Sequence, residues 1–201
     1  MLPMWRPLAA RALLASLTAL ALWGCGEEPE PAQEKEPETG RTAMTLHLTS
    51  TAFQAGGEIP ARFTCEGEDV SPPLEWSGVP EGTRSLALIV DDPDAPDPAA
   101  PKRVWVHWVL YDLPPDAGGL PEGAGSRRAA GGARDGRNDW GRTGYGGPCP
   151  PIGRHRYFHR LYALDTTLDL GEPTSADLKR AMEGHVLATG ELVGTYQKRG
   201  K

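Results

Sequence analysis

The stretch "SLALIVDDPDAP", residues 85–96, decides the fold, because an apolar run leads directly into a cluster of aspartates and prolines. "SLALIV" is apolar on both alternating faces, which is typical of a strand that is covered on two sides. "VWVHWVLY", residues 104–111, has the same character. We therefore expect two central strands in the core of a β-sandwich.

Glycine and proline divide the rest of the chain into short segments. The 201 residues include 25 Gly and 20 Pro, which interrupt helices and mark turns. Strand-like runs alternate with these breaks from about Met44, and helical periodicity is absent from the first half of this region. The sequence predicts an all-β dominated, antiparallel β-sandwich over residues 44–201, with one or two short helices.

The clearest helix signal is "TSADLKRAMEGHVLA", which predicts a C-terminal helix near residues 175–188. A threonine or serine at its start suits an N-cap, and apolar residues recur on one face. The candidate caps are Thr174 and Ser175, and the apolar face comprises Leu178, Met182 and Val186.

Residues 1–24 have the layout of a secretory signal peptide. Arg6 and Arg11 are followed by "ALLASLTALALW", which is shorter than the span of about 20 residues that crosses a membrane. The "LWGC" sequence resembles the lipobox of bacterial lipoproteins and makes Cys25 the expected lipidation site. We expect an exported protein on the periplasmic side of the cell envelope, with soluble secretion as the alternative.

Residues 25–43 are rich in Glu and Pro and carry almost no apolar side chains, which predicts a disordered tether. The lipid would then be the protein's only contact with the membrane. The net charge of −6 gives no electrostatic reason to expect nucleic acid, which is bound by clustered Lys and Arg.

Export also bears on the remaining cysteines. Cys65 and Cys149 form an even pair in an oxidising compartment, so a disulfide between them is the default expectation. The alternative is two buried free thiols. A metal site is disfavoured because neither cysteine has a ligand partner at zinc-like spacing.

Residues 115–150 are rich in Gly and poor in apolar side chains, and a loop of this length is usually functional or disordered. It ends in "GYGGPCPP", residues 144–151, whose glycines would let the backbone pass close to another group. That group is either a ligand or the rest of a tight turn.

Histidines and aspartates are the candidates for chemistry. Alternation places His107 on the face of Trp105, Val109 and Tyr111, where a satisfied core histidine is the plainer interpretation. His155 and Tyr157 lie on one face of a later strand. The aspartates of "DDPDAP", taken alone, are more simply interpreted as a polar turn.

In combination these segments are more specific. "DDPDAP", "VWVHWVLYDLP", "GYGGPCPP" and "HRYFHRLYALD", in this order, resemble the phosphatidylethanolamine-binding protein family, within it the bacterial Raf-kinase-inhibitor-like (YbhB/YbcL) branch. The resemblance runs from about Leu46 to Gln197. It implies a β-sandwich with a small anion-binding pocket at one end. Carried over motif by motif, the implied ligand-binding residues are Asp92, Asp94, Pro96, Trp105, His107, Gly147, Pro148, His155 and Tyr157.

Two departures from the family accompany this resemblance. The chain ends soon after "GTYQKRGK", without the C-terminal helix that eukaryotic members have beside the pocket. His159 stands where an apolar strand residue is expected, which we interpret as a sheet face closer to solvent.

The expected function is binding of a small anionic or phosphorylated ligand, without a cofactor, a bound metal or catalysis. Asp92 would orient the histidines, which would donate to the anion, and Asp91 and Asp97 would be solvated turn residues. Three alternatives remain: inhibition of a kinase or protease partner through the protein surface, a His/Asp hydrolase, and a metal-binding protein. No serine or cysteine stands beside a base as a nucleophile, which disfavours the hydrolase.

Overall fold

The structure is a computed structural model that describes residues 46–126 and 132–199. The expected signal peptide, the lipidation site Cys25 and the tether therefore lie outside the described residues. Within the described ranges, no helix has the length and apolar character needed to cross a membrane.

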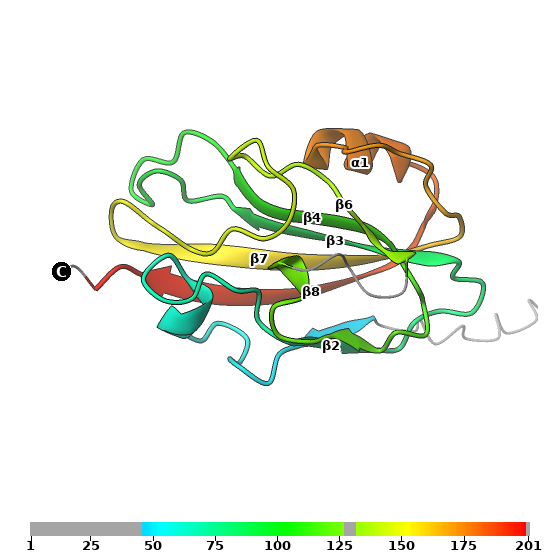
Figure 1. Cartoon of the computed structure of the whole chain (residues 1–201), viewed down its shortest axis with the longest axis horizontal. Helices are drawn as coiled ribbons and strands as arrows, with labels where there is room; N and C mark the ends of the chain where they lie inside the picture. Colours follow the sequence, from blue (N-terminus) through cyan, green and yellow to red (C-terminus); the bar gives the residue numbers. More distant parts are fainter. Residues whose placement is uncertain (1–45, 127–131, 200–201) are drawn as a thin grey trace, which may run out of the picture. The chain divides into compact units, whose positions relative to one another are not determined.

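Two antiparallel sheets form the described part of the chain (Figure 1). The larger sheet has five strands in the order β6-β4-β3-β7-β8, and the smaller has the order β1-β2-β5. The strands are β1 (His47–Thr49), β2 (Leu74–Ser77), β3 (Ser85–Asp92), β4 (Trp105–Leu113), β5 (Gly119–Leu120), β6 (Arg134–Asp135), β7 (Arg154–Leu164) and β8 (Val186–Gln197). The predicted all-β sandwich is confirmed.

Strand β3 is the centre of the larger sheet, and all eight of its residues are buried. Leu86, Leu88 and Val90 belong to the core between the two sheets. Ala87 and Ile89 belong to a second apolar cluster on the opposite face. The expectation of a strand covered on two sides is thus confirmed, although only one of the two covers is a sheet.

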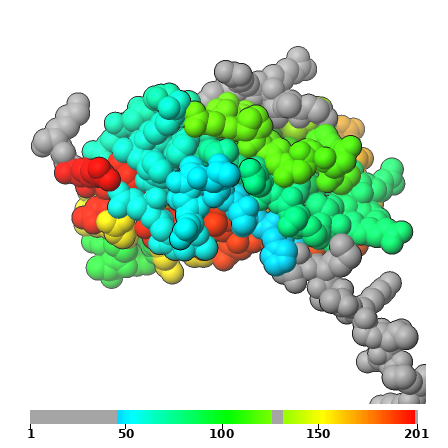
Figure 2. Space-filling view, turned by 90° about the horizontal axis from the view of Figure 1, so that it is seen from below, coloured from blue at the N-terminus to red at the C-terminus, as the bar shows by residue number. Residues whose placement is uncertain are grey.

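The smaller sheet and the segments around it cover the first face. Short 3-10 helices, η1 (Ala61–Phe63) and η2 (Ala124–Ser126), lie in the connections on this side. Figure 2 views this side and shows the early part of the described chain, in cyan, over much of it.

The second face of the larger sheet is covered by helix α1 (Ser175–Ala181), through Leu178 and the Met182 that follows it. The N-cap is Thr174, which forms a reciprocal capping box with Asp177. The helix is shorter than the predicted span 175–188.

The predicted helix span is wrong in its last two turns. Gly184 takes a left-handed backbone conformation (φ 79°), which reverses the chain, and β8 then begins at Val186. The side chain of Val186 is 43 % exposed instead of continuing the apolar face of the helix. The helical spacing of apolar residues in the sequence therefore continues beyond the point where the helix ends and the chain turns.

The described parts of the Gly-rich region, residues 115–126 and 132–150, contain strands and core residues as well as loops. They contribute β5 and β6 to the two sheets, and Ala124, Ala133 and Tyr145 are buried in the core between them. A few apolar residues are enough to hold these segments in place, because each of them packs against the larger core.

Asp91 corrects one expectation, because it is a buried residue and not a solvated turn residue. It is 2 % exposed, on the helix-covered face of the sheet. The Arg160 guanidinium forms an ion pair with its carboxylate, and the Lys179 ammonium lies 3.9 Å from it. Asp97 does lie in a turn, where its carboxylate accepts a hydrogen bond from the Ala99 N–H.

His159 corrects a second expectation, since its face of the sheet is the interior. The residue is 1 % exposed, with its ring 5.6 Å from the ring of Phe53. Neither ring nitrogen has a hydrogen-bond partner among the described residues. Burial lowers the pKa of His159 to about 4.

This burial predicts an acid-sensitive stability. The folded-state pKa of His159 lies below the usual value near 6.5, so its contribution to stability decreases as pH falls from 6.5 towards 4. We expect His159→Leu, which conserves volume, to reduce the loss of unfolding free energy between pH 7.5 and 5.0 by about 2 kcal/mol. Urea denaturation at both pH values measures this. His47→Leu, at an exposed position of β1, is the matched control, and an unchanged pH dependence in His159→Leu would contradict the prediction.

Candidate functional site

The candidate site lies at one end of the larger sheet, where β3 ends and β4 and β7 begin. Asp92 pairs with Trp105, and Asp91 pairs with Phe158, so these three strand ends are neighbours. They border a cavity of about 310 Å³. Its lining residues are Asp92, Ala95, Pro96, Trp105, His107, Trp140, Cys149, Pro150, Pro151 and His155.

A β-bulge in β4 directs His107 into this cavity. Val90 pairs with Trp108 and the next residue, Asp91, pairs with Val106, so His107 is an extra residue without a partner on β3. Trp105 and His107 line the cavity, whereas Val109 and Tyr111 pack on the helix-covered face. The simple alternation that grouped all four residues on one face is therefore wrong, because the bulge shifts the pattern by one residue.

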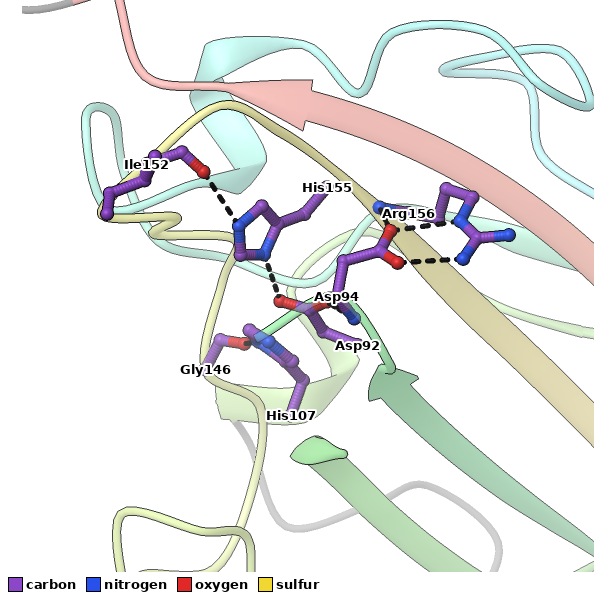
Figure 3. A network of polar contacts seen from close by, with 7 residues as sticks. All are labelled: Asp92, Asp94, His107, Gly146, Ile152, His155 and Arg156. Atoms are coloured by element: carbon purple, nitrogen blue, oxygen red, sulfur yellow. Dashed lines mark hydrogen bonds and ion pairs between the residues drawn. The ribbon is translucent and has the colours of Figure 1, made fainter. Parts of the chain in front are cut away.

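Among the residues that the structure describes, the His107 side chain makes a single hydrogen bond. Its Nδ1 donates to the Gly146 carbonyl oxygen at 2.6 Å (Figure 3). Burial lowers the pKa of His107 to about 4, so the ring is neutral at neutral pH. Its Nε2 is then an unprotonated acceptor that has no hydrogen bond within the described residues.

His155 is held at both ring nitrogens. Nδ1 lies 2.7 Å from Asp92 Oδ2, and Nε2 lies 2.9 Å from the Ile152 carbonyl oxygen (Figure 3). Because the carbonyl can only accept, Nε2 carries a proton, and a second proton is shared between Nδ1 and the carboxylate. The pair is neutral overall wherever that second proton sits. No ring nitrogen of His155 remains for a ligand in this arrangement.

Asp92 is the partner that orients His155. Burial raises the pKa of Asp92, while the hydrogen bond from His155 opposes that rise. The other carboxylate oxygen accepts from the Asp94 N–H at 2.8 Å, which fixes the turn that follows β3.

Asp94 is not among the residues that line the cavity, and binds Arg156 instead. Its two oxygens accept from the Arg156 Nε and a terminal nitrogen at 2.9 and 2.7 Å, and the Arg156 N–H also donates to it. These bonds from Arg156 hold the pKa of Asp94 below its usual value. In Figure 3 the Arg156 side chain lies on the opposite side of Asp94 from His107.

Gly147 and Pro148 also lie outside the cavity lining, and close packing explains the glycines of this loop. A Cβ on Gly147 would lie 2.5 Å from the Phe63 carbonyl oxygen, and one on Gly146 would lie 2.5 Å from the Trp140 ring. The Gly147 N–H donates to Asp69 Oδ1 at 2.6 Å. Protein atoms therefore make a close approach to both glycines.

Tyr157 lies behind the cavity wall. Its ring is 5.1 Å from that of His107 and 6.5 Å from that of His155. The hydroxyl is buried and has no hydrogen-bond partner among the described residues. Burial raises its pKa above the usual value, so it stays protonated.

Sequence reasoning missed half of the lining. Trp140 comes from the Gly-rich region, and its ring lies 5.1 Å from His107 and 5.2 Å from Trp105. A large aromatic residue among glycines was the available signal. Cys149 also lines the cavity and is bonded to Cys65. In the described part of the chain, no cluster of three or more His, Cys, Asp and Glu side chains could hold a metal ion.

Comparison with known proteins agrees with the fold. The sequence profile described as phosphatidylethanolamine-binding protein matches residues 49–197. The chain belongs to the phosphatidylethanolamine-binding protein family. The match runs from the last residue of β1 to the end of β8 and includes every residue that lines the cavity.

Relatives of this family member occur in archaea and bacteria. A "UPF0098 protein" of Methanothermobacter thermautotrophicus is 53 % identical over 156 residues, which cover 76 % of this chain and 99 % of the relative. The crystal structure of the family homologue CT736 of Chlamydia trachomatis is 43 % identical, with a TM-score of 0.71. The family member YbcL of E. coli is 35 % identical, with a TM-score of 0.69. Both structures cover 77 % of this chain and are themselves covered to 99 %.

The hydrogen bonds at His107 predict an unusual tautomer. We expect Nδ1 to be protonated and Nε2 to be unprotonated at pH 7, with a titration midpoint near pH 4, because burial opposes the charged ring. Heteronuclear NMR of the ring nitrogens measures both. A protonated Nε2 at pH 7, or a midpoint near 6.5, would contradict the arrangement.

Proposed function

We propose that this family member is a non-enzymatic binding protein that holds a small anionic ligand, such as a phosphate monoester, in the cavity at the end of β3. The observation that carries the proposal is the Nε2 of His107, which has no hydrogen-bond partner in the described part of the chain and faces a cavity that is otherwise largely apolar. A polar atom in such surroundings fixes the position and the chemistry of a ligand's head group.

The acidic residue beside the cavity is compatible with an anion. Asp92 and His155 are neutral as a pair, so the carboxylate does not contribute a net negative charge to the cavity. An anion near His107 would favour the charged form of its ring, and Nε2 would then donate to the ligand. A charge-assisted hydrogen bond of this kind contributes about 1.5–3 kcal/mol.

The walls of the cavity suggest that the ligand has an apolar part. Trp105 and Trp140 meet edge to face at 5.2 Å, and Pro150 and Pro151 also line the cavity. These side chains offer contact area and few hydrogen bonds. A monoester with an aromatic or alkyl group therefore suits the site better than free phosphate.

Binding should be coupled to proton uptake. The pKa of His107 is about 4 without ligand and rises when an anion is bound, so affinity increases as pH falls. We expect phenyl phosphate to bind about tenfold more tightly at pH 6 than at pH 8. Isothermal titration of the purified protein measures this, and we expect no release of phenol.

The variant His107→Ala tests the residue that carries the proposal. We expect it to weaken binding about tenfold or more, because the charge-assisted bond is lost. His185→Ala removes an exposed histidine beside Asp165 and is the matched control. Absence of saturable binding by the unmodified protein, or equal affinity in His107→Ala, would overturn the proposal.

We further propose that the protein acts outside the cytoplasm, anchored by a lipid on Cys25. A partner protein, such as a kinase or protease, would distinguish the ligand-bound form from the ligand-free form. The residues that precede the family match, with their signal-like start and acidic tether, support the anchor. Trp140 and Ile152, which are 42 % and 55 % exposed, offer a partner an apolar contact near the cavity.

The anchor has a direct test. In a bacterial host we expect the wild-type chain to take up labelled fatty acid and to sediment with membranes. Cys25→Ala should take up none and be released into the soluble fraction, because it lacks the thiol that carries the lipid. Equal labelling of the two chains would contradict the anchor.

A further inference from the structure

A disulfide borders the proposed ligand cavity. Cys149 is one of the lining residues, and its bond partner Cys65 has its Cα 5.4 Å away. Both cysteine residues are exposed. The disulfide therefore joins two surface residues, one of which also lines the cavity.

The disulfide secures the segment 146–152, which holds both site histidines. The first carbonyl of this segment accepts from His107, and the carbonyl of Ile152 accepts from His155. Between them, Pro148, Pro150 and Pro151 have no N–H to donate. The disulfide at Cys149 therefore constrains a segment that has few backbone N–H groups for hydrogen bonds.

Opening the bond would leave the surrounding fold in place. The Cys65 N–H donates to the Pro148 carbonyl at 3.1 Å, and the Gly147 N–H donates to Asp69. The Tyr145 hydroxyl donates to the Phe63 carbonyl at 2.9 Å. These contacts keep the two cysteines near each other, so the bond can form again.

We propose that Cys149 is a site of reversible thiol modification within the ligand cavity, and that modification excludes the ligand. A small thiol such as glutathione attacks the sulfur of Cys149, forms a mixed disulfide with it and releases Cys65, which takes the proton of the attacking thiol. A second thiol molecule then attacks the sulfur of the attached group. Cys149 is released as a free thiol, and the two small thiols leave together as their oxidised dimer. Both steps conserve atoms and electrons.

The position of Cys149 in the cavity lining determines how its modification would affect ligand binding. A group attached to Cys149 adjoins the cavity that His107 and Trp140 also line, whereas Cys65 is not among the lining residues. In an oxidising compartment the disulfide stays closed and the cavity is complete. The claim that modification excludes the ligand rests on the proposed binding function. The claim that Cys149 can be modified by a thiol does not depend on that function.

Two single-thiol variants separate the cysteines. Both are made in the full chain with Cys25→Ser, and each adds either Cys65→Ser or Cys149→Ser. Oxidised glutathione then converts the remaining thiol to a mixed disulfide and releases reduced glutathione. We expect modification of Cys149, in the Cys65→Ser chain, to weaken phenyl phosphate binding about tenfold or more, because the added peptide occupies the cavity.

The Cys149→Ser chain is the matched control: its affinity is measured before and after modification at Cys65, and the modification should not change it. NMR signals of the His107 ring and the Trp140 indole provide a readout that needs no ligand, and only modification of Cys149 should shift them. In the wild-type chain, reduced glutathione should add to Cys149 rather than Cys65, as peptide mass spectrometry shows.

The outcomes distinguish the two proposals. If the unmodified protein does not bind phenyl phosphate but the His107 and Trp140 signals shift as expected, the proposed function fails and the modification site stands. If the two modified chains behave alike in NMR, or glutathione adds only to Cys65, the modification site is overturned.

Discussion

The burial of β3 on both faces is the constraint on which the rest of the structure depends. Its side chains alternate between the core shared with the smaller sheet and the cluster under α1. The alternation continues into the two aspartates at the end of the strand. Asp91 consequently meets Arg160 on the helix side, while Asp92 meets His155 at the cavity. Adjacent residues of identical chemistry thus acquire different partners and different roles.

The site is built so that its buried charges are compensated before a ligand arrives. Asp94 is paired with Arg156, and Asp92 shares its proton with His155. Burial without a charged partner keeps His107 neutral and leaves Nε2 free. An uncompensated buried charge would be strongly destabilising, so this division of partners allows titratable groups to line a cavity without destabilising the fold.

Much of the fold could be predicted because it follows local rules. Continuous apolar runs identified β3 and β4, and a threonine or serine before helically spaced apolar residues marked the start of α1. The end of α1 could not be predicted in the same way, because apolar spacing continued beyond a glycine that reverses the chain. His159 was misplaced because a polar residue type suggested solvent, whereas the neighbouring core encloses it.

The sequence by itself determined the sandwich, the central strands, the family motifs and the histidines that are available for a site. Only the tertiary structure decided which of them meet: the bulge that turns His107 into the cavity, the carbonyls of Gly146 and Ile152 that hold the rings, and Trp140 on the wall. Hydrophobic periodicity is a property of neighbouring residues and can be read along the chain. The state and accessibility of a ring nitrogen depend on groups that are distant in sequence, and therefore on how the strands pack.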